Sequence, residues 1–204
     1  MRNTFDRFNG RHQDYQAARP SYAQEFLDWL GELYAPPERY TAADIGSGTG
    51  KLSAQLLAAG FRVCGVEPNP DMRGAAEALL GGDPRFSSSN GTDHDTGLPD
   101  RSVDMVAAAQ AFHWFDGPAF ARECRRILRP GGRAVLVWNV RGSAPMNQAL
   151  AQVFREHCPS FHGFTGGMGE DDPRIRDFFG GAYEKRRFPN PLTLDRDRFL
   201  RRCF

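Results

Sequence analysis

The run YTAADIGSGTGKLSAQLLAAG, at residues 40–60, decides the fold of this chain. Its first seven residues predict a short strand that ends in a glycine loop. The nine residues KLSAQLLAA, at 51–59, predict a helix that Gly60 stops. Glycines in such a loop let the backbone approach a ligand and adopt positive φ angles. A strand, a glycine loop and a helix in this order indicate a cofactor site.

Helices and strands alternate on both sides of this run. Further strands are expected at FRVCGV (61–66), RFSSSNG (85–91), SVDMVAAAQ (102–110) and RAVLVWN (133–139). Further helices are expected at SYAQEFLDWLGELY (21–34), NPDMRGAAEALL (69–80) and GPAFARECRRIL (117–128). Ser21 and Gln24 form a capping box for the first of these helices, and RPGG at 129–132 predicts a turn. Strands that are continuous apolar runs predict an α/β fold: a Rossmann-like, doubly wound, mostly parallel sheet with helices on both faces. Ligands bind such sheets at the carboxyl ends of the strands.

Length and charge exclude several classes of protein. The 204 residues predict a single domain, residues 1–204. The 26 basic and 25 acidic residues give a net charge of +1, which argues against a nucleic-acid partner. No stretch approaches the ~20 apolar residues of a membrane span, and the N-terminus lacks a signal peptide's apolar core, so we expect a cytoplasmic protein. The cysteines and histidines show no metal-ligand spacing, and no metal site is expected.

The glycine spacing and its acidic neighbours indicate the cofactor. Glu67 lies 17 residues beyond Gly50, at the tip of the second strand, where an acid can bind both ribose hydroxyls. Nicotinamide enzymes use G-x-G-x-x-G, whereas this loop is G-x-G-x-G followed by Lys51. Asp44 would repel a pyrophosphate but attract the ammonium group of an amino-acid-like cofactor. These features favour S-adenosylmethionine over a nicotinamide cofactor.

A family resemblance supports the same cofactor. DIGSGTGKLS (44–53), GVEPNPDM (65–72), LPDRSVDMVAAAQAFHWFD (98–116) and RECRRILRPGGRAVLVWN (122–139) resemble class I, Rossmann-like S-adenosylmethionine-dependent methyltransferases. More narrowly, the chain resembles their small-molecule branch, which includes trans-aconitate methyltransferase-like proteins. The resemblance covers roughly residues 1–140. It implies a methionine end lined by Asp44, Gly46, Ser47 and Gly48, a ribose bound by Glu67, and an adenine ring packed by Pro68 and Met72 and edged by Thr92 and Asp93. Gly50 and Gln110 complete the predicted cofactor set.

Three residues are candidates for the methyl-transfer end. His113 follows the fourth strand, where it is either a general base or a structural residue that caps the next helix. The N-P-P-[YFW] motif of methyltransferases that act on adenine or amide groups is absent at this position. The segment Y-x₃-R-P-x-Y at 15–22 resembles a family element that folds over the cofactor, so residues 1–34 are expected to form a cap. Tyr15 and Arg19 would then bind a carboxylate, either the cofactor's own or that of a substrate.

Residues 141–204 resemble the family less closely and are expected to form the substrate side. They predict helices at 145–158 and 174–180, a sixth strand near 185–194 and a further helix from Asp195. No apolar run remains for a seventh strand, so a six-stranded sheet and a truncated C-terminus are expected.

The function predicted from the sequence is methyl transfer from S-adenosylmethionine to a small molecule, with a carboxylate-bearing acceptor favoured. The alternative is a protein that binds S-adenosylmethionine with little or no catalysis. A nicotinamide oxidoreductase ranks third. The sequence does not indicate the oligomeric state.

Overall fold

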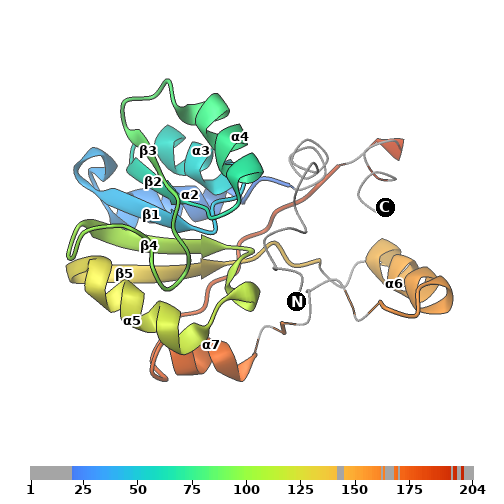
Figure 1. The fold of residues 1–204 in the computed structure, drawn as a ribbon. Coiled ribbons are helices and arrows are strands. Elements are labelled where there is room, and N and C mark those ends of the chain that lie inside the picture. The colour runs from blue at the N-terminus through green and yellow to red at the C-terminus, as the bar shows by residue number, and fades with distance from the viewer. Residues whose placement is uncertain are drawn as a thin grey trace.

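A single parallel sheet forms the centre of the molecule (Figure 1). The computed structural model describes residues 20–141, 145–161, 163, 168–169, 171–193, 195–196 and 199. Its five strands are β1 (Thr41–Ile45), β2 (Arg62–Val66), β3 (Phe86–Ser89), β4 (Val103–Ala109) and β5 (Leu128–Val137). Their order across the sheet is β3-β2-β1-β4-β5, and all pairs are parallel. The α/β, doubly wound fold predicted from the sequence is confirmed.

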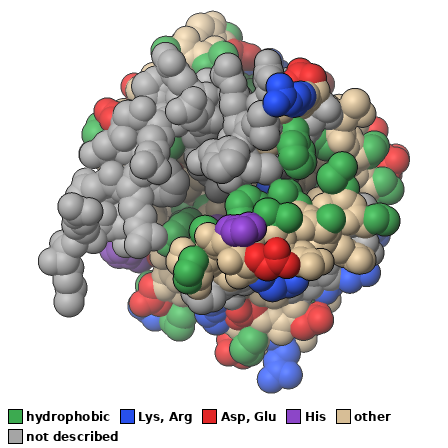
Figure 2. All heavy atoms as spheres, turned by 90° about the vertical axis from the view of Figure 1, so that its right-hand side faces the viewer, with side chains coloured by type: hydrophobic (Ala, Val, Ile, Leu, Met, Phe, Trp, Pro, Cys, Tyr) green, Lys and Arg blue, Asp and Glu red, His purple; other side chains and the backbone are tan. Residues whose placement is uncertain are grey.

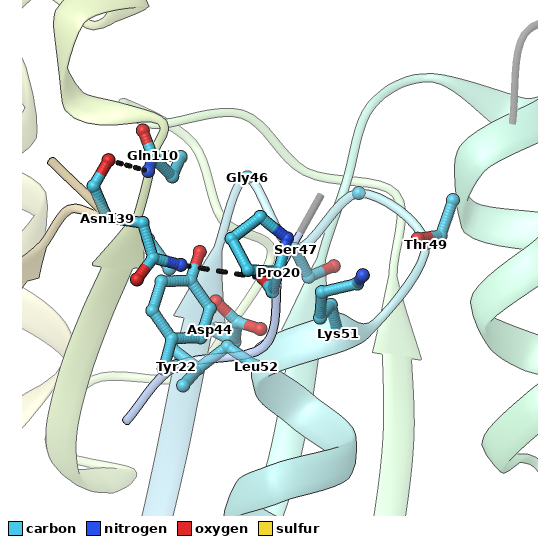
Figure 3. A pocket seen from close by; sticks show the side chains of 12 residues that line it. Pro20, Tyr22, Asp44, Gly46, Ser47, Thr49, Lys51, Leu52, Gln110 and Asn139 are labelled. Atoms are coloured by element: carbon cyan, nitrogen blue, oxygen red, sulfur yellow. Dashed lines mark hydrogen bonds between the residues drawn. The ribbon is translucent and has the colours of Figure 1, made fainter. Parts of the chain in front are cut away.

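Helices cover both faces of the sheet. They are α2 (Gln24–Leu33), α3 (Lys51–Ala58), α4 (Pro70–Leu80), α5 (Gly117–Ile127) and α7 (Pro173–Phe178). Helix α6 (Pro145–His157) lies away from the sheet in Figure 1, and 3-10 turns occur at Pro37–Arg39 and Phe112–Trp114. Figure 1 shows α3 and α4 on one side of the sheet and α5 and α7 on the other. Successive strand residues point to opposite faces, so Ala42 packs with α2 and α3 while Ala43 packs with α5 and α7. Strands buried on both faces need the continuous apolar runs seen in the sequence.

Side-chain caps begin three of the described helices, α4, α5 and α7. The Asn69 side chain accepts hydrogen bonds from the backbone N–H groups of Asp71 and Met72 at the start of α4. Asp116 accepts in the same way from Ala119 at the start of α5. These caps satisfy N–H groups that have no partner within the first turn of a helix.

The capping box predicted for the first helix is wrong. Helix α2 begins after Ala23, which makes no side-chain cap, so Ser21 lies two residues before the capping position. The Gln24 amide donates forward along the helix to Asp28 instead of back to the helix start.

The predicted turn at RPGG is also wrong, because residues 129–132 lie within β5. The pairing of β5 with β4 is irregular here. Leu128 lies opposite Val103, and the regular register resumes only where Arg133 lies opposite Met105. Gly131 has a φ of +83°, which glycine adopts without strain, so the extra residues form a bulge in the strand.

The sixth strand predicted near residues 185–194 is absent from the described part of that segment, 185–193. The segment lies against α2: the Phe188 ring centroid is 5.8 Å from that of Phe26 and 5.9 Å from that of Trp29. Two prolines, Pro189 and Pro191, remove backbone donors that a ladder would need. The helix predicted from Asp195 lies largely outside the described residues. Within the described ranges, no helix is long and apolar enough to cross a membrane.

Candidate functional site

A pocket opens where β1, β4 and β5 end, beside the glycine loop (Figure 3). The strand order reverses at β1, whose neighbours β2 and β4 lead away in opposite directions, and ligands bind parallel sheets at such a switch point. The pocket is lined by Pro20, Tyr22, Asp44, Gly46, Ser47, Gly48, Thr49, Lys51, Leu52, Ala109, Gln110 and Asn139. Five of the predicted site residues therefore meet here: Asp44, Gly46, Ser47, Gly48 and Gln110.

The three loop glycines have different reasons to be glycine. All three have positive φ angles: +69° at Gly46, +57° at Gly48 and +79° at Gly50. A Cβ atom at Gly46 would lie 2.8 Å from that of Ala111, and one at Gly50 would lie 2.8 Å from Leu80 Cδ1. These two positions bring the loop close to other protein elements. A Cβ atom at Gly48 would have no heavy atom of the described residues within 4 Å, so this part of the chain leaves room for a ligand there.

Asp44 is a buried carboxylate with one unsatisfied oxygen. Its side chain rises at the end of β1 and is 1% exposed. Oδ2 accepts a 2.7 Å hydrogen bond from Ser53 Oγ, whereas Oδ1 has no hydrogen-bond partner among the described residues. Burial raises the pKa of Asp44 to about 6, against the opposing effect of the Ser53 hydrogen bond. A buried, incompletely paired carboxylate favours a cationic donor, and an ammonium group meets that requirement.

Glu67, at the end of β2, holds the glycine loop in place. Its Oε2 accepts from Gly48 N and its Oε1 from Asn69 N, both at 2.9 Å. Burial raises the pKa of Glu67, and these two hydrogen bonds oppose the rise. A carboxylate has about four acceptor positions, so each oxygen keeps capacity for a ribose hydroxyl. The anchoring of Gly48 was not evident from the sequence, because it depends on the distance between two strand ends.

A polar cluster joins four distant segments beside the pocket. Gln110, with a φ of +54°, donates from Nε2 to the Asn139 carbonyl at 3.1 Å. Asn139 Nδ2 donates to the Ser21 carbonyl at 3.2 Å. Asn190 Nδ2 lies 2.8 Å from both the Ser21 carbonyl and Asn139 Oδ1. Sequence reasoning missed Asn139 and Asn190. The available signal was the position of Asn139, a polar residue directly after an apolar strand.

The predicted adenine residues do not line this pocket. Met72 is buried on α4. Thr92 exchanges hydrogen bonds with Asp95, and the Asp93 carboxylate accepts from Asp116 N. Their contacts with a cofactor remain predictions, as does that of Pro68.

The predicted methyl-transfer residues are only partly described. His113 lies on the 3-10 turn after β4, is half-buried, and has its ring centroid 4.8 Å from that of Trp114. It does not line the pocket, and its role as a base remains a prediction. Tyr15 and Arg19 lie outside the described residues, as does most of the predicted cap. Sequence reasoning also missed Tyr22, Thr49 and Lys51 as lining residues.

Known proteins are similar to this chain in sequence and in fold. A family model described as a methyltransferase domain matches residues 43–136. An uncharacterised methyltransferase of Mycobacterium tuberculosis is 42% identical over 127 residues, which are 62% of this chain and 49% of the relative. One from Schizosaccharomyces pombe is 31% identical over 71% of this chain and 57% of its own. The chain thus spans about half the length of these curated relatives.

Two solved structures extend the comparison. A protein described as a type II methyltransferase, from Anaeromyxobacter dehalogenans, is 30% identical with a TM-score of 0.57, over 86% of this chain and 70% of its own. A methyltransferase described as part of an antibiotic biosynthesis pathway, from Anabaena variabilis, is 25% identical with a TM-score of 0.60, over 81% and 63%. Together with the glycine loop, the buried Asp44 and the sheet order, these likenesses show that the chain belongs to the class I S-adenosylmethionine-dependent methyltransferases.

Proposed function

We propose that this protein transfers a methyl group from S-adenosylmethionine to a small-molecule acceptor, with a carboxylate-bearing acceptor favoured. The observation that carries the proposal is buried Asp44 Oδ1, which has no hydrogen-bond partner among the described residues and lies in the same pocket as Gly48. A cofactor with an ammonium group on a flexible methionine end supplies the missing donor.

Both charges of the methionine end have a counterpart in the pocket. Asp44 would accept a hydrogen bond from the ammonium group. Lys51, on the first turn of α3, is the only basic residue lining the pocket in the described part of the chain, and it would face the carboxylate. Gly46 and Ser47 would border this end of the cofactor. Glu67 would bind the ribose, and we assign the adenine ring to the side of Pro68, Met72, Thr92 and Asp93.

The protein's contribution to the transfer is alignment. When bound, S-adenosylmethionine supplies a methyl group already activated on a sulfonium. An anionic acceptor such as a carboxylate then needs only to be held in line, and correct orientation alone lowers the barrier substantially. A hydroxyl or amine acceptor would need a base, and His113 is our candidate for that role.

The resemblance to trans-aconitate methyltransferase-like proteins supports a carboxylate acceptor. In the same resemblance, Arg19 and Tyr15 would bind a carboxylate, the arginine through two parallel hydrogen bonds. This assignment belongs to the proposal, since both residues lie outside the described part of the chain.

Isotope transfer tests the proposal. The protein would be incubated with S-adenosylmethionine carrying a deuterated methyl group and with a pool of cellular metabolites. Mass spectrometry would then measure the masses of the products. We expect at least one small acid to gain the labelled methyl group, and the Asp44→Asn variant to form markedly less of that product when the cofactor is not saturating. Calorimetry with S-adenosylhomocysteine and NADH gives the parallel test of the cofactor. Tight binding of S-adenosylhomocysteine without any labelled product would support the non-catalytic alternative instead.

A further inference from the structure

Helix α5 carries a buried acid, Glu123, that does not line the cofactor pocket. Its side chain is 6% exposed. The carboxylate oxygen Oε1 accepts from Thr96 N at 2.9 Å and from Thr96 Oγ1 at 2.6 Å. Arg126, one helical turn further on, donates from Nη2 to Oε1 at 2.7 Å and from Nε to Oε2 at 2.8 Å. The arginine neutralises the buried charge, and the carboxylate fixes both donors of one residue in a different segment.

Thr96 closes a compact loop, residues 91–96, between β3 and β4. The Thr96 side chain is fully buried. Its carbonyl accepts a 2.8 Å hydrogen bond from Ser89 Oγ at the end of β3. A Cβ atom at Gly91 would lie 2.4 Å from the same carbonyl oxygen, so the two ends of the loop touch. A shift of Thr96 would therefore move the residues inside the loop as well.

The start of loop 91–96 lies beside the acid that we assign to the ribose. Arg73 Nη1 donates to the Glu67 carbonyl at 2.7 Å and to Asn90 Oδ1 at 3.0 Å. The Glu67 N–H group donates to the Ser89 carbonyl at 3.1 Å. The loop thus leaves β3 next to the ribose position.

The middle of the loop contacts the chain that follows β4. Asp93 Oδ2 accepts from Asp116 N at 3.1 Å. The residue before it, Phe115, packs close to the glycine loop, since a Cβ atom at Gly46 would lie 3.2 Å from its ring. Figure 1 shows the segment between β3 and β4 crossing from the side of β3 toward α5. The loop is thus tied both to the ribose side of the site and to the segment that packs on the glycine loop, as a wall for the base would be.

Recognition of a particular base needs hydrogen-bonding groups held in position. Figure 2 looks onto the side of the molecule toward which the carboxyl ends of the strands point, where hydrophobic side chains lie at the surface among charged ones. Apolar surface packs against any planar ring, because every base has a similar face. Donors and acceptors at the edge of the ring distinguish adenine from another base, and they do so only if they are held at fixed positions.

We propose that Glu123 is a positioning residue for the cofactor, which holds loop 91–96 through Thr96 so that Thr92 and Asp93 meet the edge of the adenine ring. The inference rests on the proposed function and on its assignment of these two residues to adenine. Glu123 itself touches neither the cofactor nor the reacting atoms. Loss of its contact with Thr96 weakens recognition of the base and leaves the methionine end of the site intact.

Two ligands that differ only in the base test this role. S-adenosylhomocysteine and S-inosylhomocysteine, in which a carbonyl replaces the adenine amino group, would each be titrated into the protein by calorimetry. We expect the natural protein to prefer the adenine compound. Glu123→Gln and Thr96→Val should each weaken binding of that compound by about tenfold and bring the preference between the two compounds close to one. Glutamine is a poor substitute because one of its two terminal atoms is a donor, so it cannot accept from both Thr96 and Arg126.

Three further measurements separate positioning from stability. If Glu123 and Thr96 act through one contact, the double variant should bind no more weakly than the weaker single variant. Thr96→Ser keeps both donors and should keep the preference for adenine. A purely structural Glu123 would lower Tm and leave the preference at its natural value. An unchanged preference in Glu123→Gln and Thr96→Val, or strictly additive losses, would overturn the proposal, as would equal binding of the two compounds by the natural protein.

A matched control breaks another ion pair. Arg129 Nη1 lies 2.7 Å from Asp104 Oδ2, near the start of β4 and away from the pocket lining. Arg129→Gln should therefore keep the natural preference for adenine, and an equal loss there would attribute the effect to general destabilisation and overturn the proposal. Absence of S-adenosylhomocysteine binding in the natural protein would instead contradict the proposed function.

Discussion

Replacing Asp44 with asparagine separates the contribution of this carboxylate to the stability of the fold from its contribution to cofactor binding. The carboxylate is buried, only one of its oxygens has a hydrogen-bond partner among the described residues, and burial raises its pKa from 3.8 to about 6. Between these pH values the folded chain holds the proton more tightly than the unfolded chain. Stability is therefore lost as the pH rises through this window, and the loss is complete above about pH 6.

The magnitude follows from the shift in pKa. A shift of about two units corresponds to roughly 3 kcal/mol of destabilisation at neutral pH, since each unit is worth about 1.4 kcal/mol. An asparagine oxygen can still accept the Ser53 hydrogen bond, but its buried N–H group costs part of the gain, about 1–2 kcal/mol. We expect Asp44→Asn to be more stable by about 1–2 kcal/mol at pH 8, which raises Tm by about 2–8 °C for a chain of this size. The gain should disappear near pH 4.

Urea unfolding at pH 4, 6 and 8 measures this difference in stability. Calorimetry with S-adenosylhomocysteine measures the loss of cofactor affinity. The variant should bind at least about tenfold more weakly, because it loses the charged partner of the ammonium group. Asp104→Asn is the matched control. Asp104 Oδ2 is paired with Arg129 and with Thr41 N, so that variant should lose stability at pH 8. An Asp44→Asn variant with unchanged stability at pH 8 and unchanged affinity would refute the reasoning.

Four further outcomes test the site and the scaffold. Glu67→Ala should weaken S-adenosylhomocysteine binding by about 1.5–3 kcal/mol in calorimetry, and an unchanged affinity would exclude the ribose assignment. Gly48→Val should also weaken binding, because valine strains a φ of +57° and fills the open side of the loop; a folded variant with normal affinity would exclude this loop as the cofactor site. If His113 is a base, His113→Asn should lower kcat, remove the acid limb of the pH–rate profile and leave cofactor affinity alone, whereas a structural histidine would show lost stability and an unchanged profile. Burial raises the pKa of Glu123, but hydrogen bonds from Arg126 and Thr96 outweigh it and lower the value from 4.5 to about 2. Its contribution to stability is therefore full above pH 4.5 and is lost as the pH falls toward 2, and Glu123→Gln should flatten the unfolding free energy across that range.

The fold and five of the lining residues of the pocket could be predicted, because the residues that determine them lie close together in the sequence. Short apolar runs such as VDMVAAA, bounded by turn residues, indicate strands buried on two faces, and their alternation with helices then indicates a doubly wound sheet. Asn69 followed by Pro70 marks a helix start by its own hydrogen bonding and fixed φ. Asp44, Gly46 and Gly48 directly follow or end a strand, and parallel strands bring their carboxyl ends to one edge.

Predictions failed where distant segments decide the outcome. Ser21 has the right residue type for a cap, but α2 begins only after Ala23, and Asn139 and Asn190, more than a hundred residues away, donate to the Ser21 carbonyl before the helix. Residues 185–193 resemble a strand in composition, yet the Phe188 ring packs against Phe26 and Trp29 on α2, and two prolines in the segment lack the N–H donors of a ladder.

By itself, then, the sequence determined the strand–loop–helix unit, the type of sheet and the cofactor class, because apolar runs, helix periodicity and the glycine loop are each read from residues close together in the chain. Only the tertiary structure decided that one oxygen of Asp44 has no hydrogen-bond partner among the described residues, that Glu67 anchors Gly48, and that Asn139 and Asn190 meet at Ser21. These properties depend on distances between atoms of segments far apart in the chain, and such distances are set by how the elements pack together.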